Sequence, residues 1–167
     1  MGLFRQQNPV VRRRSDGTYD VVLDARAIHL LDDALGAISR LLEDPDEPML
    51  ARLSPVAYPD DPEREAGYRL LAGEELRTSQ QEAMSVLREV FAGATATEEQ
   101  LWAAIRALNT VRLVTGTMLG IETEDDGPRP DLAPDDPTYG IWALYDLTGW
   151  TQHFVVDALS GTMRPPG

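Results

Sequence analysis

The chain contains no cysteine among its 167 residues. It therefore cannot form a disulfide, offer a thiol nucleophile, hold zinc through thiolates or sense oxidants by sulfur pairing. It also contains no lysine, because all fifteen basic residues are arginine. This second absence excludes Schiff-base chemistry, a lysine general base and a Walker-type phosphate loop.

Positive charge is also scarce, because 28 acidic residues give the chain a net charge of −13. Such a surface opposes general nucleic-acid binding, which requires a basic footprint for the phosphates. Residues 1–14 are the exception: they hold four arginines and no acid, which leaves about −17 on the rest of the chain. Two interpretations of Arg12, Arg13 and Arg14 stay open, namely contact with a protein partner or solvation of an edge strand.

Long hydrophobic runs are absent as well. Arg112 interrupts the apolar stretch 107–121 and Asp146 interrupts 138–156, which leaves runs well below the roughly 18 residues that span a membrane. The opening MGLFRQQNPV lacks the apolar core of a signal peptide. We therefore expect a soluble, cytoplasmic protein that forms one domain over residues 1–167.

The predicted fold is mainly α: an N-terminal β-hairpin packed on a bundle of about four longer helices plus one short helix. The hairpin spans about 9–24, with Asp16-Gly17 at its turn. Hydrophobic periodicity and helix-end signals predict helices at about 25–43, 49–54, 62–92, 97–120 and 138–159. Acids and prolines dominate 121–137, so we expect an acidic loop there with too little apolar surface to order itself.

Particular residues mark the ends and crossings of these helices. The expected N-caps are Asp24, Asp61 and Thr97. The expected terminating glycines are Gly93 and Gly120. Gly116 and Gly149 lie inside predicted helices, where glycine costs about 1 kcal/mol, and this indicates close helix crossings.

The apolar stretch ALNTVRLVTGTMLGI carries Arg112 in its middle. At 100° per residue Arg112 falls on the apolar stripe of its helix, so we expect it to be sealed inside the bundle. A buried charge needs a partner, and Asp146 is the first candidate, with Asn109 completing the hydrogen bonds and Glu75 or Glu82 as reserves. This network is expected to be structural, and the alternative interpretation is a ligand-binding arginine.

Catalytic patterns are weak. The two histidines, His29 and His153, show no metal-binding spacing and no nucleophile elbow, although Asp146, His153 and Asp157 could align on one helix face. The acidic loop lacks the alternating oxygen ligands and terminal glutamate of a calcium loop. We therefore expect no enzyme, no metal and no cofactor.

Three stretches carry a family resemblance: ARLSPVAYPDD (51–61), ALNTVRLVTGTMLGI (107–121) and YDLTGWTQHFV (145–155). They resemble an actinobacterial family of domains of unknown function, also known as AosR-like oxidative stress regulators, and the resemblance covers nearly the whole chain. Its pattern positions are Asn109, Arg112, Gly116, Leu119, Gly120, Tyr145 and Asp146. The resemblance implies a cytoplasmic regulator of transcription under oxidative stress, with a sigma factor or the Clp adaptor system as candidate partners.

The expected function is therefore a non-enzymatic regulatory module that acts through protein–protein contacts, without direct binding of nucleic acid or membrane. A homodimer is compatible with the sequence, whereas thiol-based switching is not, because cysteine is absent. The alternative is a small-molecule-binding protein or weak hydrolase built around Arg112, Asn109 and Asp146. That alternative requires Arg112 to line an open pocket.

Overall fold

The computed structural model describes residues 8–44, 47–54, 56–123 and 131–161. Strands β1 (Val11–Arg13) and β2 (Tyr19–Val21) precede helix α1 (Ala25–Leu41) and the 3-10 helix η1 (Pro48–Leu53). Helix α2 (Pro62–Gly93), strand β3 (Thr95–Ala96), helix α3 (Glu98–Met118) and helix α4 (Tyr139–Ser160) follow. The predicted hairpin-and-bundle fold is confirmed, and the helices begin and end within two residues of the predicted positions.

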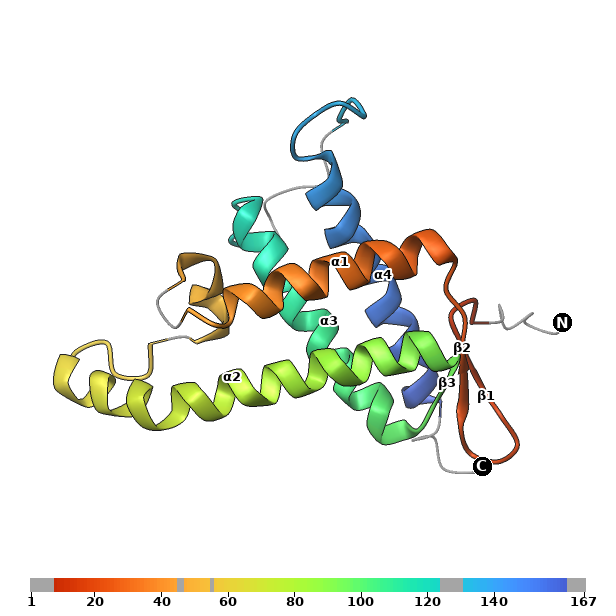
Figure 1. Ribbon diagram of the computed structural model, residues 1–167, viewed down its shortest axis with the longest axis horizontal. Helices are drawn as coiled ribbons and strands as arrows, with labels where there is room; N and C mark the ends of the chain where they lie inside the picture. Colours follow the sequence, from red (N-terminus) through yellow and green to blue (C-terminus); the bar gives the residue numbers. More distant parts are fainter. Residues whose placement is uncertain (1–7, 45–46, 55, 124–130, 162–167) are drawn as a thin grey trace, which may run out of the picture.

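Helix α3 is the centre of the bundle and packs against α1, α2, α4 and η1 (Figure 1). Its buried positions lie on most of its faces, as the apolar sequence predicts. The main hydrophobic cluster joins α1, η1, α2 and α3 through fully or nearly buried side chains that include Leu31, Leu35, Leu50, Leu87 and Leu108. No helix in the described ranges combines the length and the hydropathy that a membrane crossing requires.

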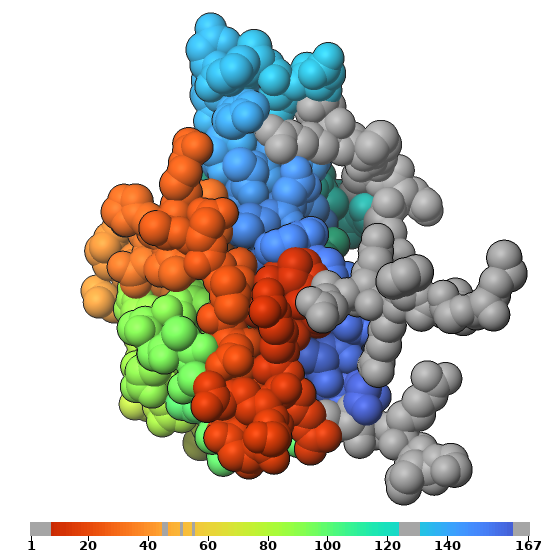
Figure 2. Space-filling view, turned by 90° about the vertical axis from the view of Figure 1, so that its right-hand side faces the viewer, coloured from red at the N-terminus to blue at the C-terminus, as the bar shows by residue number. Residues whose placement is uncertain are grey.

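The strands form one antiparallel sheet in the order β1-β2-β3. Its inner face buries Tyr19 and Val21 in a second cluster with Leu101 and Val155. Figure 2 views this end of the molecule and shows the hairpin packed between α4 and the α2–α3 side. Strand β3 was not predicted, because two residues between two helices are too few to show strand alternation.

Helix ends follow local chemistry. All three predicted N-cap side chains accept a backbone N–H: Asp24, Asp61 and Thr97. Gly120 follows α3 with φ +68°, as predicted, and Ile121 N–H donates to the Gly116 carbonyl to close the helix. The prediction for α2 was wrong by one residue, because Ala94 rather than Gly93 adopts the left-handed conformation, with φ 56°.

Only the C-terminal half of helix α2 buries side chains against the rest of the protein. Its buried side chains are Ala83, Met84, Leu87 and Val90, all in the C-terminal half. The N-terminal half extends away from the sheet, at the opposite end of the bundle (Figure 1). We call residues Pro62–Ser79 the α2 overhang. The apolar spacing of the sequence places Leu76 on one face with Ala83, Leu87 and Val90, and this prediction is wrong at Leu76, which lies in the overhang and is exposed.

Candidate functional site

The side chain of Arg112 contacts an aromatic ring of α4. Its guanidinium carbon lies 4.8 Å from the centre of the Tyr145 ring, and its Nη2 donates to the Tyr145 hydroxyl at 3.3 Å. Gly149, one turn after Tyr145, provides the space, because a Cβ at Gly149 would lie 2.9 Å from Arg112 Nη1. The guanidinium is therefore seated against a glycine and a ring of the neighbouring helix.

The contact is reciprocal between the two helices. Gly116 lies one turn after Arg112 on α3, and a Cβ there would lie 3.5 Å from Tyr145 Cε2 and 3.6 Å from Arg52 Nη1. Each large side chain thus occupies the space that a glycine leaves on the other helix. This arrangement explains why both glycines sit inside helices and confirms the predicted close crossing.

The predicted sealed network around Arg112 is wrong. Arg112 is half-buried, and Asn109 and Asp146 are exposed. Among the ion pairs of the described residues, none joins Arg112 to Asp146 or to the reserve acids Glu75 and Glu82, which are also exposed. Since water reaches the guanidinium, its charge needs no buried acid, and the Tyr145 ring replaces the expected carboxylate.

The predicted basic residues lie at the edge of the sheet. Arg12 and Arg13 are exposed on β1, which is an edge strand. Arg14 pairs with Asp20 at 2.9 Å and with Asp16 at 3.6 Å across the hairpin turn. This placement agrees with a solvated edge strand. Contact with a partner through these arginines stays a prediction.

The histidines lie on exposed helix surfaces. His29 approaches Asp33 at 3.5 Å on α1, and the His153 ring packs edge-on against Phe154 on α4. Asp157 accepts a hydrogen bond from Asn8 at 3.2 Å. Within the described ranges, no group of three or more acidic or histidine side chains is placed to hold a metal ion.

Exposed apolar side chains gather around the α2 overhang. Of the twelve large exposed apolar residues in the described ranges, six lie between positions 49 and 76: Met49, Val56, Tyr68, Leu70, Leu71 and Leu76. Leu70 and Leu71 are 80% and 81% exposed. Isolated exposed leucines are ordinary on protein surfaces, and this concentration makes the segment a candidate binding surface.

The linker before α2 holds the overhang in place. Glu65 accepts backbone N–H bonds from Ala57 at 3.0 Å and from Tyr58 at 2.9 Å, and it pairs with Arg69 at 2.9 Å. These bonds, with the Tyr58 N–H contributing most, lower the pKa of Glu65. The Tyr58 ring packs edge-on against Tyr68 at 6.0 Å. The exposed leucines therefore lie on an anchored helix.

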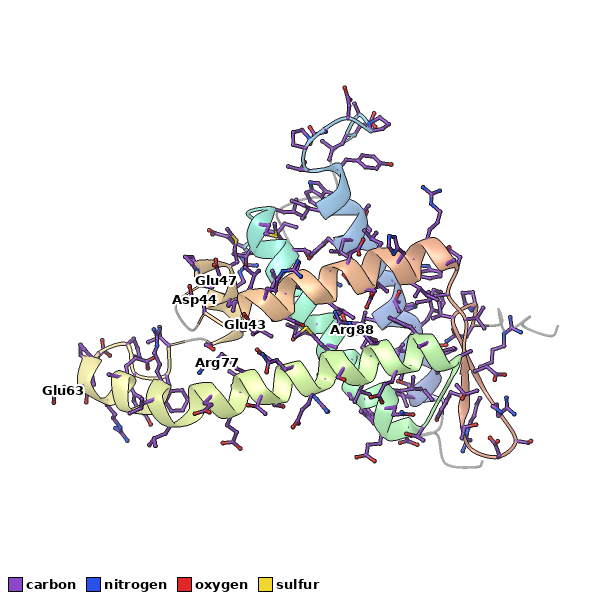
Figure 3. The ribbon with its side chains drawn as sticks, viewed as in Figure 1. Glu43, Asp44, Glu47, Glu63, Arg77 and Arg88 are labelled. Atoms are coloured by element: carbon purple, nitrogen blue, oxygen red, sulfur yellow. The ribbon has the colours of Figure 1, made fainter. Side chains whose placement is uncertain are left out.

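A groove of about 590 Å³ runs between η1 and the overhang. We call it the η1/α2 groove. Its apolar surface includes Leu42, Leu50, Leu53, Tyr68 and Leu76. Its charged lining consists of Asp44, Glu47, Glu65, Glu75, Arg69 and Arg77. Figure 3 shows Glu43, Asp44 and Glu47 gathered above α2, with Arg77 below them.

A second groove of about 600 Å³ lies between α2 and α3. Trp102, which is partly exposed, lines it together with Glu82, Glu98, Glu99 and Arg106. Ser79 lines both grooves, so they flank the same part of α2. In each groove an exposed aromatic side chain lies among an excess of carboxylates.

Comparison with known proteins identifies the family of the chain. Residues 5–159 match the family model described as a domain of unknown function (DUF2017). The chain belongs to the DUF2017 family. No curated protein and no solved structure matches it. In this DUF2017 member the matched range includes every helix but the last residue of α4, so the overhang and both grooves belong to the family domain.

Sequence reasoning missed Leu70 and Leu71 as surface residues of this DUF2017 protein. The apolar pattern carries no signal for their exposure, because Tyr68, Leu70, Leu71 and Ala72 stand close together in the first half of α2. Adjacency is no sign of exposure either, because Ala83 and Met84 are adjacent in the same helix and both are buried. The sequence did hold a signal for the Arg112–Tyr145 contact. Each of these residues stands four positions before a glycine, Gly116 and Gly149 respectively.

Substitution of Arg112 by methionine is expected to lower the free energy of unfolding by about 1 kcal/mol, because the half-exposed guanidinium loses only a ring contact and a long hydrogen bond. A buried ion pair would instead cost about 3–5 kcal/mol when one partner is removed. Thermal unfolding measures the difference. Arg106→Met, at an exposed position of the same helix, is the control and should change stability by less than about 0.5 kcal/mol.

Proposed function

We propose that this DUF2017 protein is a non-enzymatic regulatory or adaptor module that binds another protein through its α2 overhang. The observation that carries the proposal is the exposure of Leu70 and Leu71 on a helical segment with no buried side chain of its own. Burying an exposed leucine side chain contributes about 1.5–3 kcal/mol. A partner that covers both leucines therefore gains a substantial part of the binding free energy of a specific complex.

The alternative of a small-molecule site around Arg112, Asn109 and Asp146 has less support. None of the three lines either groove described above. Arg112 is engaged by Tyr145, and the other two side chains are exposed. A ligand site requires convergent polar groups in a concave pocket, whereas the overhang offers two exposed leucines beside a groove.

The family resemblance supplies the setting that we propose for this binding. AosR-like proteins of actinobacteria regulate transcription under oxidative stress, and we propose a comparable cytoplasmic role for this chain. A sigma factor and the Clp adaptor system are the candidate classes of partner. Because the chain has no cysteine, its own contribution would be a protein contact rather than thiol chemistry.

Substitution of Leu70 and Leu71 together by serine is expected to reduce capture of the partner at least tenfold. Tagged protein would be used to capture partners from a lysate of the source organism, with quantification by mass spectrometry. Both side chains are exposed, so the thermal stability should stay within about 0.5 kcal/mol of the wild type.

The matched control replaces two other exposed apolar residues, Val22 after β2 and Val156 on α4, by serine. This control should capture the same partners as the wild type. Equal capture by the Leu70/Leu71 variant and the wild type would contradict the proposal.

A further inference from the structure

The η1/α2 groove has the shape and the chemistry to receive part of a helix. Leu42, Leu50 and Leu53 form a floor that is continuous with the main hydrophobic cluster, and Leu76 and Tyr68 form an exposed apolar wall. Its volume of about 590 Å³ lies inside the range of about 300–1,000 Å³ typical of ligand pockets. Several neighbouring side chains of a partner helix therefore fit into it.

The charges around the groove favour a cationic occupant. Glu65 and Arg69 neutralise each other in an ion pair, and the backbone of Ala57 and Tyr58 also occupies Glu65. Beyond this pair, the lining carries Glu47 and Glu75 against one further arginine, Arg77. The excess of acid at the groove has the same sign as the net charge of −13 of the whole chain.

The net charge of the chain favours a different protein, rather than a second copy of this chain, as the occupant of the groove. Two bodies of charge −13 repel each other, and the long-range field slows their encounter at low salt. A partner with positive charge is attracted by the same field. The acidic rim and the apolar floor together therefore favour an amphipathic helix with basic flanks.

We propose that the η1/α2 groove binds an amphipathic helix of the partner protein, with leucine-like side chains on one face and arginine or lysine on its flanks. This inference rests on the proposed function, because it specifies which part of the partner enters the groove. On the partner helix, apolar side chains at positions i, i+3, i+4 and i+7 would enter the groove, and the basic side chains beside them would contact Glu47 and Glu75.

The test uses the full chain, labelled with nitrogen-15, and two synthetic helical peptides with the same leucine face. One peptide carries lysine on its polar face and the other carries glutamate. The lysine peptide is expected to bind at least tenfold more tightly, to shift amide signals of η1 and of residues 65–80, and to weaken as salt increases. Equal affinities, or shifts confined to other elements, would overturn the inference.

Charge reversal provides the matched variants. Glu75→Arg at the groove is expected to weaken the lysine peptide at least fivefold. Glu89→Arg, an exposed position in the C-terminal half of the same helix, should leave its affinity within twofold. Equal effects of the two reversals would show attraction to the acidic surface in general and would contradict the inference.

Two further outcomes separate this inference from the proposed function. A doubling of mass in light scattering that Glu75→Arg abolishes would assign the groove to a second copy and overturn the inference. If the lysine peptide does not bind but the Leu70/Leu71 variant still loses its partner, the inference fails and the proposed function stands. If the peptide binds the groove while that variant captures its partner normally, the proposed function fails.

Discussion

Substitution of Leu108 by alanine is expected to lower the free energy of unfolding by about 3 kcal/mol, within the range of about 2–5 kcal/mol for large-to-small changes in cores. Leu108 is fully buried on α3, where the main cluster draws side chains from α1, η1 and α2 around it. At this chain length the loss corresponds to a fall in Tm of about 6–12 °C. Thermal unfolding followed by circular dichroism measures it.

The matched control for Leu108 is the same substitution at Leu71. Because Leu71 is 81% exposed, its replacement by alanine removes almost no buried surface and should change stability by less than about 0.5 kcal/mol. A loss at Leu71 comparable to that at Leu108 would mean that the overhang is packed within the folded chain. That result would also remove the basis for a docking surface.

Substitution of Gly116 by leucine is expected to lower the free energy of unfolding by about 2 kcal/mol, because the added carbons enter the space of the Tyr145 ring. Alanine at the same position should instead raise stability by about 1 kcal/mol, because its Cβ meets Tyr145 at an ordinary contact distance and improves helix propensity. Chemical denaturation of both variants measures the difference in sign.

Gly67 is the control position for the close α3–α4 crossing at Gly116. It lies inside α2, and a Cβ there would meet no atom within 4 Å. Both alanine and leucine at Gly67 should therefore stabilise the chain, by up to about 1 kcal/mol, through helix propensity alone. If leucine were tolerated equally well at Gly116 and at Gly67, the reciprocal packing of α3 and α4 would be wrong.

Much of the fold was predictable because local signals agree with the packing. The N-caps Asp24, Asp61 and Thr97 and the terminating Gly120 act through their own neighbouring backbone, so they can be recognised without tertiary information. The spacing of Leu31, Leu35 and Ile38 also predicts the buried face of α1. Strand β3 depends on pairing with β2, and this long-range contact leaves no local signal.

The environment of Arg112 was predicted wrongly for a physical reason. A helical projection gives the direction of a side chain but not the depth at which its end lies, and a long arginine side chain can reach water from an apolar stripe. The prediction also assumed that the guanidinium of Arg112 needs a carboxylate as its partner. Tyr145 and the space at Gly149 satisfy the guanidinium without an acid, and the pairing is visible only when α3 and α4 are placed together.

The candidate docking surface combines a predictable and an unpredictable part. Helix α2 itself was predicted from the sequence, whereas the exposure of Leu70, Leu71 and Leu76 was not. The η1/α2 groove joins Leu42 and Asp44, which follow α1, to residues of η1 and α2, so it follows from the packing of these segments.

Site-specific photo-crosslinking in the source organism tests the central claim, that the α2 overhang contacts another protein. A benzophenone amino acid would be placed at position 71 in the overhang and, separately, at position 22, which is also exposed but lies at the sheet. We expect a discrete adduct with one partner protein from position 71 and not from position 22. No adduct from position 71, or the same adducts from both positions, would contradict the claim.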